Sequence, residues 1–248
     1  MGINSTMANR EVCDLIFVDY NTKAPFLNLD FANTSSTELT GETVFAYGGK
    51  GHPKRVSFSG EKGGTLTIET QMQSVKLWQM ITGGSLAKSS KYVKREVLTV
   101  VETKKVTLSE EPAAGTTVNI YKIDDDCGTD LKGSVSTKEV TITGEVSTGD
   151  QVVVYYTKEV KDKVQVINIK STSFPKAFTV YGDTYMKTEE DDILPYRLVA
   201  YKCVPQSNMT LSFANSGDPG TVTITCDLMA DKDNNILDLI LEEESVSA

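Results

Sequence analysis

Apolar and polar residues alternate along most of the chain. In GTVTITCDLM, residues 220–229, apolar side chains from Val222 to Leu228 occupy every second position, with threonine or aspartate between them. A period of two is typical of a β-strand with one buried face. The same alternation recurs in RVSFSG, TLTIET, TTVNIY, EVTITG, QVVVYY, MTLSFA and ILDLIL. The pattern therefore predicts a protein that is mainly β.

One segment, TQMQSVKLWQMITGG, departs from this period and predicts a helix over residues 71–82. Thr70 and Gln73 have the spacing of a capping box, and Gly83 with Gly84 supplies a left-handed stop. The apolar side chains spread around most of the helix, so burial on two sides is expected. Either one large core surrounds the helix, or its second side packs on a neighbouring subunit. The candidate subunit-interface residues are Val75, Leu77, Trp78, Met80 and Ile81.

Turn-rich sequences divide the chain into two parts. GGSLAKSSKY, residues 83–92, is small, polar and basic, as is typical of a linker. Beyond it, SEEPAAG, DDDCGTD, ITGEVS and STGD separate short strands at intervals of about 10 residues, as in a small β-sandwich. Longer segments resume at KVQVINIK. We therefore predict an inserted small β-domain over residues 96–162, within a larger β-domain formed by residues 1–95 and 163–248.

The stretch LMADKDNNILDLILEEE resembles a calcium-binding loop at first sight. Asp231, Asp233 and Asn235 alternate as EF-hand ligands do, and Glu242 falls at the twelfth position. That motif also requires a helix on each side and a glycine at the sixth position, where this chain has Ile236. Both flanks alternate as strands do, and aspartate and asparagine suit turns. We therefore predict that ADKDNN joins two antiparallel strands as a hairpin.

Length and charge narrow the classes of function. The chain has 248 residues, of which 25 are basic and 34 acidic, and its formal charge is −9. That length supports a core that needs neither disulfides nor a structural metal. No block of lysine or arginine favours nucleic-acid binding, and excess negative charge repels passing DNA. The longest apolar runs, such as LIFV and VVVYY, are too short to span a bilayer, and MGINSTMANREV lacks the apolar core of a signal peptide. We expect folding in a reducing cytoplasm and no membrane partner.

Residues that could perform catalysis or bind a metal are few. His52, in GGKGHPKR, is the single histidine, so no catalytic triad, zinc site or haem site is expected. The acidic runs IDDDCGTD, KTEEDD and LEEE are typical of solvated faces. Asp124, Asp126 and Asp130 could hold a surface cation, but Gly128 is not placed as an EF-hand requires. We therefore expect no enzymatic activity, no catalytic or metal-binding residues and no cofactor.

The four cysteines are far apart and form no C-x-x-C pair. We interpret them as small buried apolar residues or free thiols. They are Cys13, Cys127, Cys203 and Cys226.

Three stretches of the chain together indicate a family. They are RVSFSGEKGGTLTIETQMQSVKLWQMITGG, FPKAFTVYGDTY and PYRLVAYKCVPQSNMTLSFANSGDPGTVTITCDLMADKDNNILDLI. A T-L-T-I-E-T strand leads into a short capped helix, and the C-terminal part contains a strand, a G-D-P-G turn, a strand and the D-x-D-x-N turn. In these features the chain resembles the tail tube (major tail) proteins of tailed bacteriophages, over residues 1–95 and 163–248. Inserted immunoglobulin-like β-domains, which would fit residues 96–162, are familiar in phage virion proteins.

The resemblance implies a tail-tube-like β-sandwich or barrel with one flanking helix and an immunoglobulin-like insert. It implies a non-enzymatic virion structural protein, assembled in the host cytoplasm into hexameric rings that stack as the tail tube and form the channel for genome delivery. Implied partners are further copies of the chain and other tail proteins, such as the tape measure, the terminator and a sheath, while DNA passes without specific binding. The alternatives are a capsid cement or head-completion protein, or a host-surface-binding protein that acts through the insert.

Two further segments bear on assembly. Asn33–Lys54 contains glycines and β-formers without a helix period, and so long a loop needs a reason. Either part of it is an extended arm ordered by contact with a neighbour, or it is a surface hairpin. KTEEDD, at residues 187–192, and LEEE, near the C-terminus, could line an acidic bore, face the exterior or contact a neighbouring ring.

Overall fold

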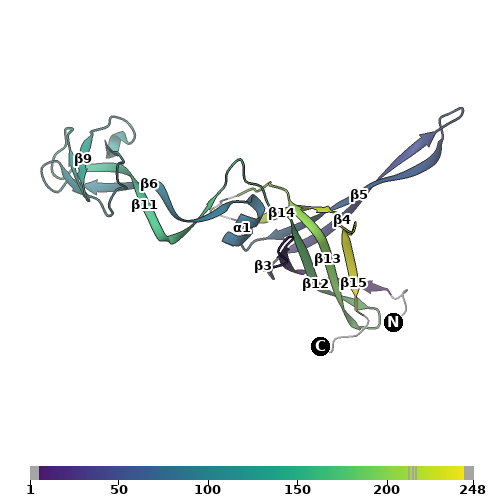
Figure 1. Ribbon diagram of the computed structural model, residues 1–248. Coiled ribbons are helices and arrows are strands. Elements are labelled where there is room, and N and C mark those ends of the chain that lie inside the picture. The colour runs from purple at the N-terminus through teal and green to yellow at the C-terminus, as the bar shows by residue number, and fades with distance from the viewer. Residues whose placement is uncertain (1–5, 212, 214, 216, 243–248) are drawn as a thin grey trace. The chain divides into compact units, whose positions relative to one another are not determined.

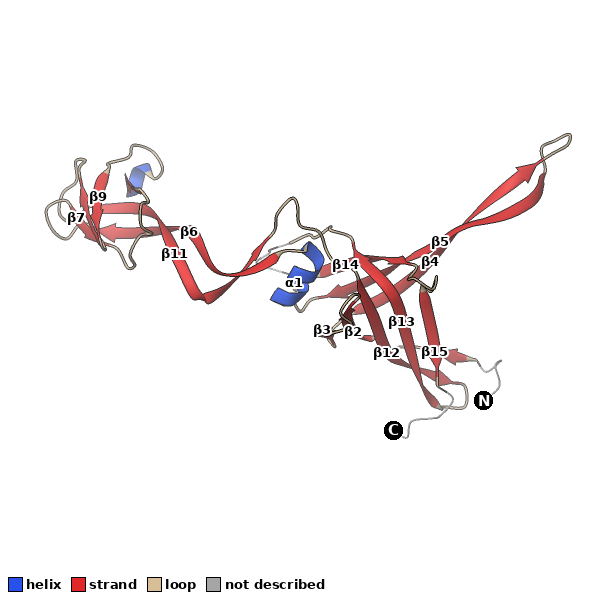
Figure 2. Cartoon of the chain, viewed as in Figure 1, coloured by secondary structure: helices blue, strands red, loops and turns tan. Residues whose placement is uncertain are grey.

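The structure is a computed structural model that describes residues 6–242 except residues 212, 214 and 216 (Figure 1). Strands make up most of it, so the predicted mainly β fold is confirmed (Figure 2). No helix in the described part of the chain is long and apolar enough to cross a membrane. In chain order the elements are β1 (Met7–Ala8), β2 (Asp14–Asp19), β3 (Pro25–Leu29), β4 (Thr34–Tyr47), β5 (Lys54–Thr70), α1 (Val75–Thr82), β6 (Ser85–Thr99), β7 (Lys105–Thr107), β8 (Val118–Lys122), the short 3₁₀ helix η1 (Ile123–Asp125), β9 (Gly133–Ser136), β10 (Glu139–Ile142), β11 (Gln151–Asn168), β12 (Phe178–Thr188), β13 (Ile193–Pro205), β14 (Val222–Met229) and β15 (Leu237–Leu241).

The chain folds as two compact units. Unit 1 comprises Met1–Ser85 and Ile167–Ala248, and unit 2 comprises Leu86–Val166. Unit 2 therefore extends beyond the predicted limits of 96 and 162 at both ends. The residues SLAKSSKY, expected to form a linker, lie in β6. They can do so because pairing with β11 satisfies their peptide groups without requiring a buried face.

Unit 1 is built on a nine-stranded sheet with the strand order β3-β2-β12-β13-β14-β5-β4, in which β1 pairs with β12 and β15 with β13. All of these pairs are antiparallel. Apolar side chains at alternate positions face the side on which α1 packs, and there they form one core. Its fully buried members include Phe17, Leu29, Ile68, Ile81, Val180 and Cys226. The opposite side of this sheet, which we call the outer face, carries the intervening residues.

Helix α1 spans Val75–Thr82 and therefore begins four residues later than predicted. Its N-cap is Ser74, whose Oγ accepts a hydrogen bond from the backbone N–H of Leu77 at 3.1 Å. The predicted capping box of Thr70 and Gln73 is wrong. Thr70 ends β5 and is fully buried, and its hydroxyl accepts the N–H of Met72 instead.

The predicted end of the helix is confirmed. Gly83 has φ +66° and donates its N–H to the carbonyl oxygen of Gln79 at 2.9 Å. This left-handed conformation is the one that glycine adopts without a steric penalty.

The ADKDNN turn does not form the predicted hairpin, because β14 and β15 do not pair with each other. Both strands lie antiparallel to β13 and follow one another along it: β14 pairs with Lys202–Pro205, and β15 pairs with Tyr196–Ala200. The turn chemistry itself is confirmed, since the Asp231 carboxylate accepts the N–H groups of Asp233 and Asn235 at 2.9 and 2.8 Å. The chain therefore leaves the sheet at the turn and then returns as β15, which pairs with β13 in the same antiparallel direction as β14.

One predicted strand is missing. The described residues of MTLSFA, Met209–Leu211 and Phe213, are not in a strand, and residues 212 and 214 lie outside the described residues. Alternation over so short a segment does not determine whether a partner strand is available.

Unit 2 contains two three-stranded sheets, β7-β10-β9 and β6-β11-β8. Apolar residues of both sheets meet in one core, as a small β-sandwich requires. They include Val106, Val140 and Ile142 from the first sheet and Ile120, Val154 and Tyr156 from the second. Unit 2 therefore has a core of its own.

Candidate functional site

The distal part of the β4–β5 hairpin, residues 41–62, projects from the sheet of unit 1 (Figure 1). We call it the arm. Strand β14 pairs with β5 only between Gly64 and Thr70, so the arm consists of two strands with two unpaired edges. Its residues are exposed except Phe45 and Gly48, which are half-buried. A two-stranded ribbon is marginally stable alone in water, so the arm has the form of an element that another molecule covers.

One face of the arm is apolar. Val44 lies opposite Phe58, and Ala46 lies opposite Val56, so these four side chains share a face. Val44, Val56 and Phe58 are 54%, 51% and 57% exposed. On the other face, the ammonium of Lys54 lies 3.9 Å from the ring centroid of Phe45 and covers it. The arm is therefore amphipathic, with its apolar face open to solvent.

The tip of the arm is basic. Residues 43–60 contain Lys50, Lys54 and Arg55 and no acidic residue, which gives a formal charge of +3 with His52 neutral. Within the described residues, none of these three cations forms an ion pair with a carboxylate. Glycines with positive φ at 49 and 51 close the turn. The segment predicted to be either an extended arm or a surface hairpin is thus a hairpin. Its register shifts between Gly41 and Thr43 and between Ala46 and Tyr47, and only residues 48–53 lie outside its strands.

The outer face of the sheet presents hydroxyl and acidic side chains on β14, β5 and β4, whereas on β2, β12 and β15 it also exposes Ile16, Tyr181 and Ile240. Cross-strand pairing places Asp227, Thr65 and Glu38 in one row, because Thr65 pairs with both of the others. A second row joins Thr223 and Glu69 in the same way. On the neighbouring strands Asp14 lies opposite Asp183, which lies opposite Arg197. Val18 and Thr179, which pair with each other on this face, are 7% and 3% exposed, so the face is covered at that point.

Arg197 partly neutralises the carboxylates of this face. Its guanidinium pairs with Asp183 at 3.2 Å and also with Glu242, the first glutamate of LEEE. Glu242 follows β15, with its N–H donated to Pro195, while residues 243 and 244 lie outside the described residues. These pairs are exposed, so they orient side chains more than they stabilise the fold.

KTEEDD spans the end of β12 and the turn to β13: Lys187 and Thr188 belong to β12, and residues 189–192 form the exposed turn. Lys187 pairs with Asp191 at 2.6 Å, and this contact lowers the pKa of the Asp191 carboxyl. Glu189, Glu190 and Asp192 form no ion pair within the described residues. The segment from 187 to 192 therefore carries a formal charge of −3.

The negative charge of the chain is concentrated in one unit. Unit 1 contains 13 basic and 21 acidic residues, a formal charge of −8, whereas unit 2 contains 12 basic and 13 acidic residues, a formal charge of −1. Since the tip of the arm is positive, the rest of unit 1 is more acidic than its total indicates.

The candidate interface residues of α1 divide into two groups. Leu77, Met80 and Ile81 are buried in the core of unit 1, where they face its sheet. Val75 and Trp78 are half-buried, so they are the two that a second subunit could still cover. The Trp78 Nε1 atom is buried and has no hydrogen-bond partner within the described residues.

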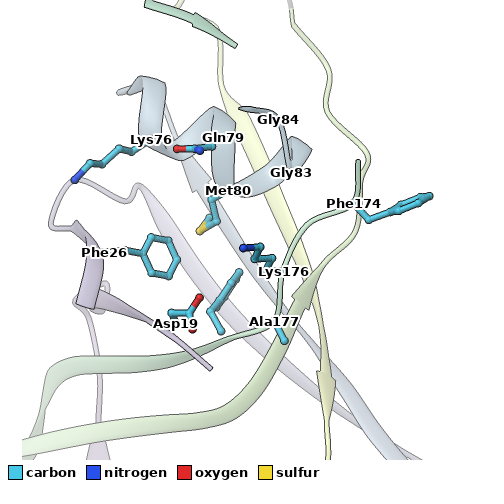
Figure 3. Close-up of a pocket in the computed structure, with 11 residues that line it drawn as sticks. Asp19, Phe26, Lys76, Gln79, Met80, Gly83, Gly84, Phe174, Lys176 and Ala177 are labelled. Atoms are coloured by element: carbon cyan, nitrogen blue, oxygen red, sulfur yellow. The ribbon is translucent and has the colours of Figure 1, made fainter. Parts of the chain in front are cut away.

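A cavity of about 410 Å³ lies beside the C-terminal end of α1 (Figure 3). Phe26, Met80 and Phe178 supply its apolar wall, and Lys76, Lys176 and Asp19 supply charge. Phe174 is 73% exposed at its edge and points away from the other lining residues (Figure 3). The cavity brings together no nucleophile and general base, so we assign it no chemistry.

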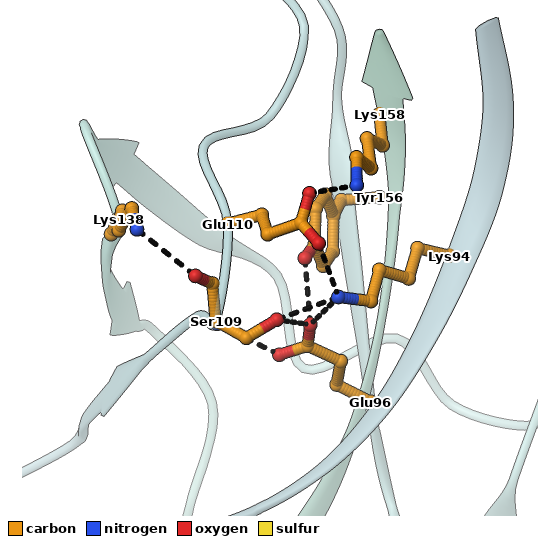
Figure 4. Close-up of polar contacts among 7 residues, drawn as sticks. All are labelled: Lys94, Glu96, Ser109, Glu110, Lys138, Tyr156 and Lys158. Carbon is orange, nitrogen blue, oxygen red and sulfur yellow. Dashed lines mark hydrogen bonds and ion pairs between the residues drawn. The ribbon is translucent and has the colours of Figure 1, made fainter. Parts of the chain in front are cut away.

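Unit 2 has a polar cluster on the strands β6 and β11 (Figure 4). Burial opposes ionisation of Glu96, whose side chain is 10% exposed, but hydrogen bonds from Lys94, Ser109 and Tyr156 outweigh it and lower the pKa of Glu96 to about 2. Lys94 also contacts Glu110, which pairs with Lys158. In this ion-pair network two lysines neutralise two glutamates, so we interpret the cluster as a structural contact between strands and loops and not as a catalytic site.

Within the described residues, no group of three histidine, cysteine or acidic side chains is arranged to hold a metal. Two of the three carboxylates considered for a surface cation have other partners. Asp126 pairs with Arg95 at 2.8 Å, and Asp130 accepts the N–H groups of Ile120 and Lys132 at 3.1 and 2.9 Å.

The buried cysteines agree with the interpretation from sequence. Cys203 and Cys226 lie in the core of unit 1, and burial raises the pKa of the Cys203 thiol to about 12. Cys13 is half-buried and Cys127 is exposed, and all four are free thiols.

A surface hairpin was one of the two alternatives predicted for the Asn33–Lys54 segment, but its apolar face was not predicted. A signal for the hairpin was present: RVSFSG alternates, VFAY is rich in β-forming residues, and the two flank the glycine-rich GGKGHPKR, as the two strands of a hairpin do. A family model described as the YomU/Tube protein family matches residues 9–240, which is nearly the whole chain. No curated protein matches the chain.

Proposed function

The chain belongs to the YomU/Tube protein family of phage tube proteins, and from that premise we propose that it assembles into hexameric rings that stack as a tail tube. Membership makes it a phage tube-type structural protein and a component of the virion. The bore of the stacked rings would be the channel through which the genome is delivered to the host.

The observation that carries this proposal is the outer face of the nine-stranded sheet. Over β14, β5 and β4 it presents rows of threonines and carboxylates, in a unit with a formal charge of −8. DNA moving along such a surface meets hydrogen-bonding groups but is repelled by charge, so it slides without binding. We infer that the outer face lines the bore. A basic surface potential along the bore of an assembled ring would overturn this inference.

The arm, which projects beyond the sheet, also supports assembly. Its apolar face and its unpaired edges would be covered by a neighbouring copy, which removes the exposed strand edges that promote disordered association. Limited proteolysis of residues 41–62 in the polymer and in the monomer tests this role. Protection in the polymer is expected, and equal cleavage in both states would exclude the arm from the contact.

A tube subunit needs no catalytic group or cofactor, and the clusters described above supply none that we can assign to a reaction. Its partners in this proposal are further copies of itself and the other tail proteins, such as the tape measure and the terminator, with a sheath in a contractile tail. Assembly would take place in the host cytoplasm before the tail joins the head.

Electron microscopy of the purified protein at high concentration tests the proposed function. Six-fold rings or hollow tubes are expected. Persistent monomers or trimers, even when other tail proteins are added, would contradict the tube and favour a capsid cement protein.

A further inference from the structure

The arm tip and the β12–β13 turn carry opposite, unpaired charges. The tip has a formal charge of +3 from Lys50, Lys54 and Arg55, and the turn, taken with the end of β12 from residue 187, has a formal charge of −3. Both are exposed ends of hairpins in unit 1. Figure 1 shows that they project from different parts of the sheet, and within one chain no ion pair joins them.

We propose that the basic arm tip of one copy binds the acidic β12–β13 turn of a second copy. This proposal rests on the proposed function, because it names the partner surface of the arm within the tube. The contact is head-to-tail: each copy offers a tip and a turn that are different surfaces. Such contacts propagate into rings or open polymers rather than stopping at a dimer.

Other acidic runs fit the tip less well. In the DDD run of unit 2, Asp126 is paired with Arg95, and the Asp125 carboxylate accepts the N–H of Thr129 at 2.9 Å. On the outer face, Asp183 and Glu242 are paired with Arg197, and the other carboxylates lie on separate strands instead of in one turn. In the β12–β13 turn, by contrast, Glu189, Glu190 and Asp192 have no cationic partner in the described part of the chain.

The two parts of the arm would contribute differently. Burial of Val44, Val56 and Phe58 supplies most of the affinity, since exposed ion pairs add little each. The charged tip selects where the arm docks and speeds the encounter, and its effect falls as salt screens it. Polymerisation is therefore expected to weaken between low salt and about 0.5 M salt, where the Debye length is only a few ångströms.

A charge-swap experiment tests the pairing. The variants are Lys54→Glu with Arg55→Glu in the tip, Glu189→Lys with Glu190→Lys in the turn, and the combination of all four. Each double variant should raise the critical concentration for polymerisation by about tenfold or more, because like charges then face each other. The quadruple variant should return to within about threefold of the unchanged protein, because the pairs are restored in reverse.

Lys232→Glu and Glu145→Lys, at exposed positions outside both surfaces, serve as matched controls and should polymerise normally. Thermal unfolding of each monomer verifies that the fold is intact. If the unchanged protein polymerises and both double variants polymerise equally well, or the quadruple variant is not rescued, this pairing is wrong although the tube stands. If the unchanged protein never polymerises, the proposed function itself fails, and this pairing fails with it.

Discussion

Gly83 lies directly against the backbone of Phe174: a Cβ atom added to Gly83 would be 2.4 Å from both the carbonyl carbon and the carbonyl oxygen of Phe174. Figure 3 shows the two residues beside the cavity at the end of α1. Gly83 also has φ +66°, so it meets two requirements at once: a left-handed helix end and close contact with the chain that returns from unit 2.

Gly83→Ala is therefore expected to destabilise unit 1. Left-handed strain costs about 1–2 kcal/mol for a residue with a side chain, and the added methyl group meets rigid backbone, so the loss should be about 2 kcal/mol or more. Urea unfolding followed by the fluorescence of Trp78, the single tryptophan, reports on unit 1. Gly51→Ala is the control for strain alone, since Gly51 has φ +85° but open space around it at the arm tip, and it should cost at most about 1–2 kcal/mol, less than Gly83→Ala.

The position of the helix N-cap gives a second prediction. Ser74→Ala removes the acceptor of the Leu77 N–H and should lower the free energy of unfolding of unit 1 by about 1 kcal/mol. Gln73→Ala should have almost no effect, because Gln73 is exposed and the capping box predicted from sequence does not form. The same fluorescence measurement compares the two variants, and a larger loss for Gln73→Ala would contradict the N-cap that we assign.

The ion-pair network of unit 2 should make this unit sensitive to acid. The pKa of Glu96 is lowered from 4.5 to about 2 in the folded protein, so its contribution to stability is complete above about pH 4.5 and is lost as the pH falls toward 2. Hydrogen exchange of the β11 amides from Val152 to Tyr156, measured between pH 6 and pH 3, follows the opening of unit 2. Glu96→Gln should flatten this dependence, and an unchanged pH profile would show that another carboxylate causes it.

Removal of unit 2 should leave unit 1 folded. A Cβ atom added to Gly84 would be 2.6 Å from Ile167, so the chain leaves and re-enters unit 1 at adjacent points. Replacement of residues 86–166 by a short glycine-serine linker therefore needs little loop closure, at a cost of roughly 1–3 kcal/mol. Unfolding followed by Trp78 fluorescence and electron microscopy of the product check the fold and polymerisation. Loss of the unit 1 transition would show that unit 2 is needed for folding.

The arm should affect assembly without affecting the fold. Phe58→Ser replaces an exposed side chain, so the unfolding of unit 1 should change by less than about 0.5 kcal/mol, while sedimentation should show less polymer. Phe178→Ala is the contrasting variant. It removes a core ring that packs edge-on against Phe17, with 5.3 Å between the ring centroids. The substitution should lower the free energy of unfolding by about 3–5 kcal/mol. Normal polymerisation by Phe58→Ser would exclude the apolar face from the contact.

Much of the fold could be predicted from sequence because burial has a period. The alternation from Val222 to Leu228 determined which side chains of β14 enter the core, and the structure buries all four apolar positions. Gly83 determined the end of α1, because few other residues adopt its conformation. Local chemistry also determined that Asp231 organises a turn. Such features depend on neighbours in the chain and are therefore visible in the sequence.

The partners of these elements were decided by the tertiary structure. The sequence suggested that β14 and β15 form a hairpin, yet both pair with β13, since a turn does not specify which strand edge is free to receive the returning chain. Thr70 was predicted to cap the helix, but it is the last residue of β5. Its hydroxyl is buried and accepts the N–H of Met72. The apolar face of the arm likewise depends on register across β4 and β5. Strand pairing and register join residues far apart in the chain, and only the folded sheet fixes which of them meet.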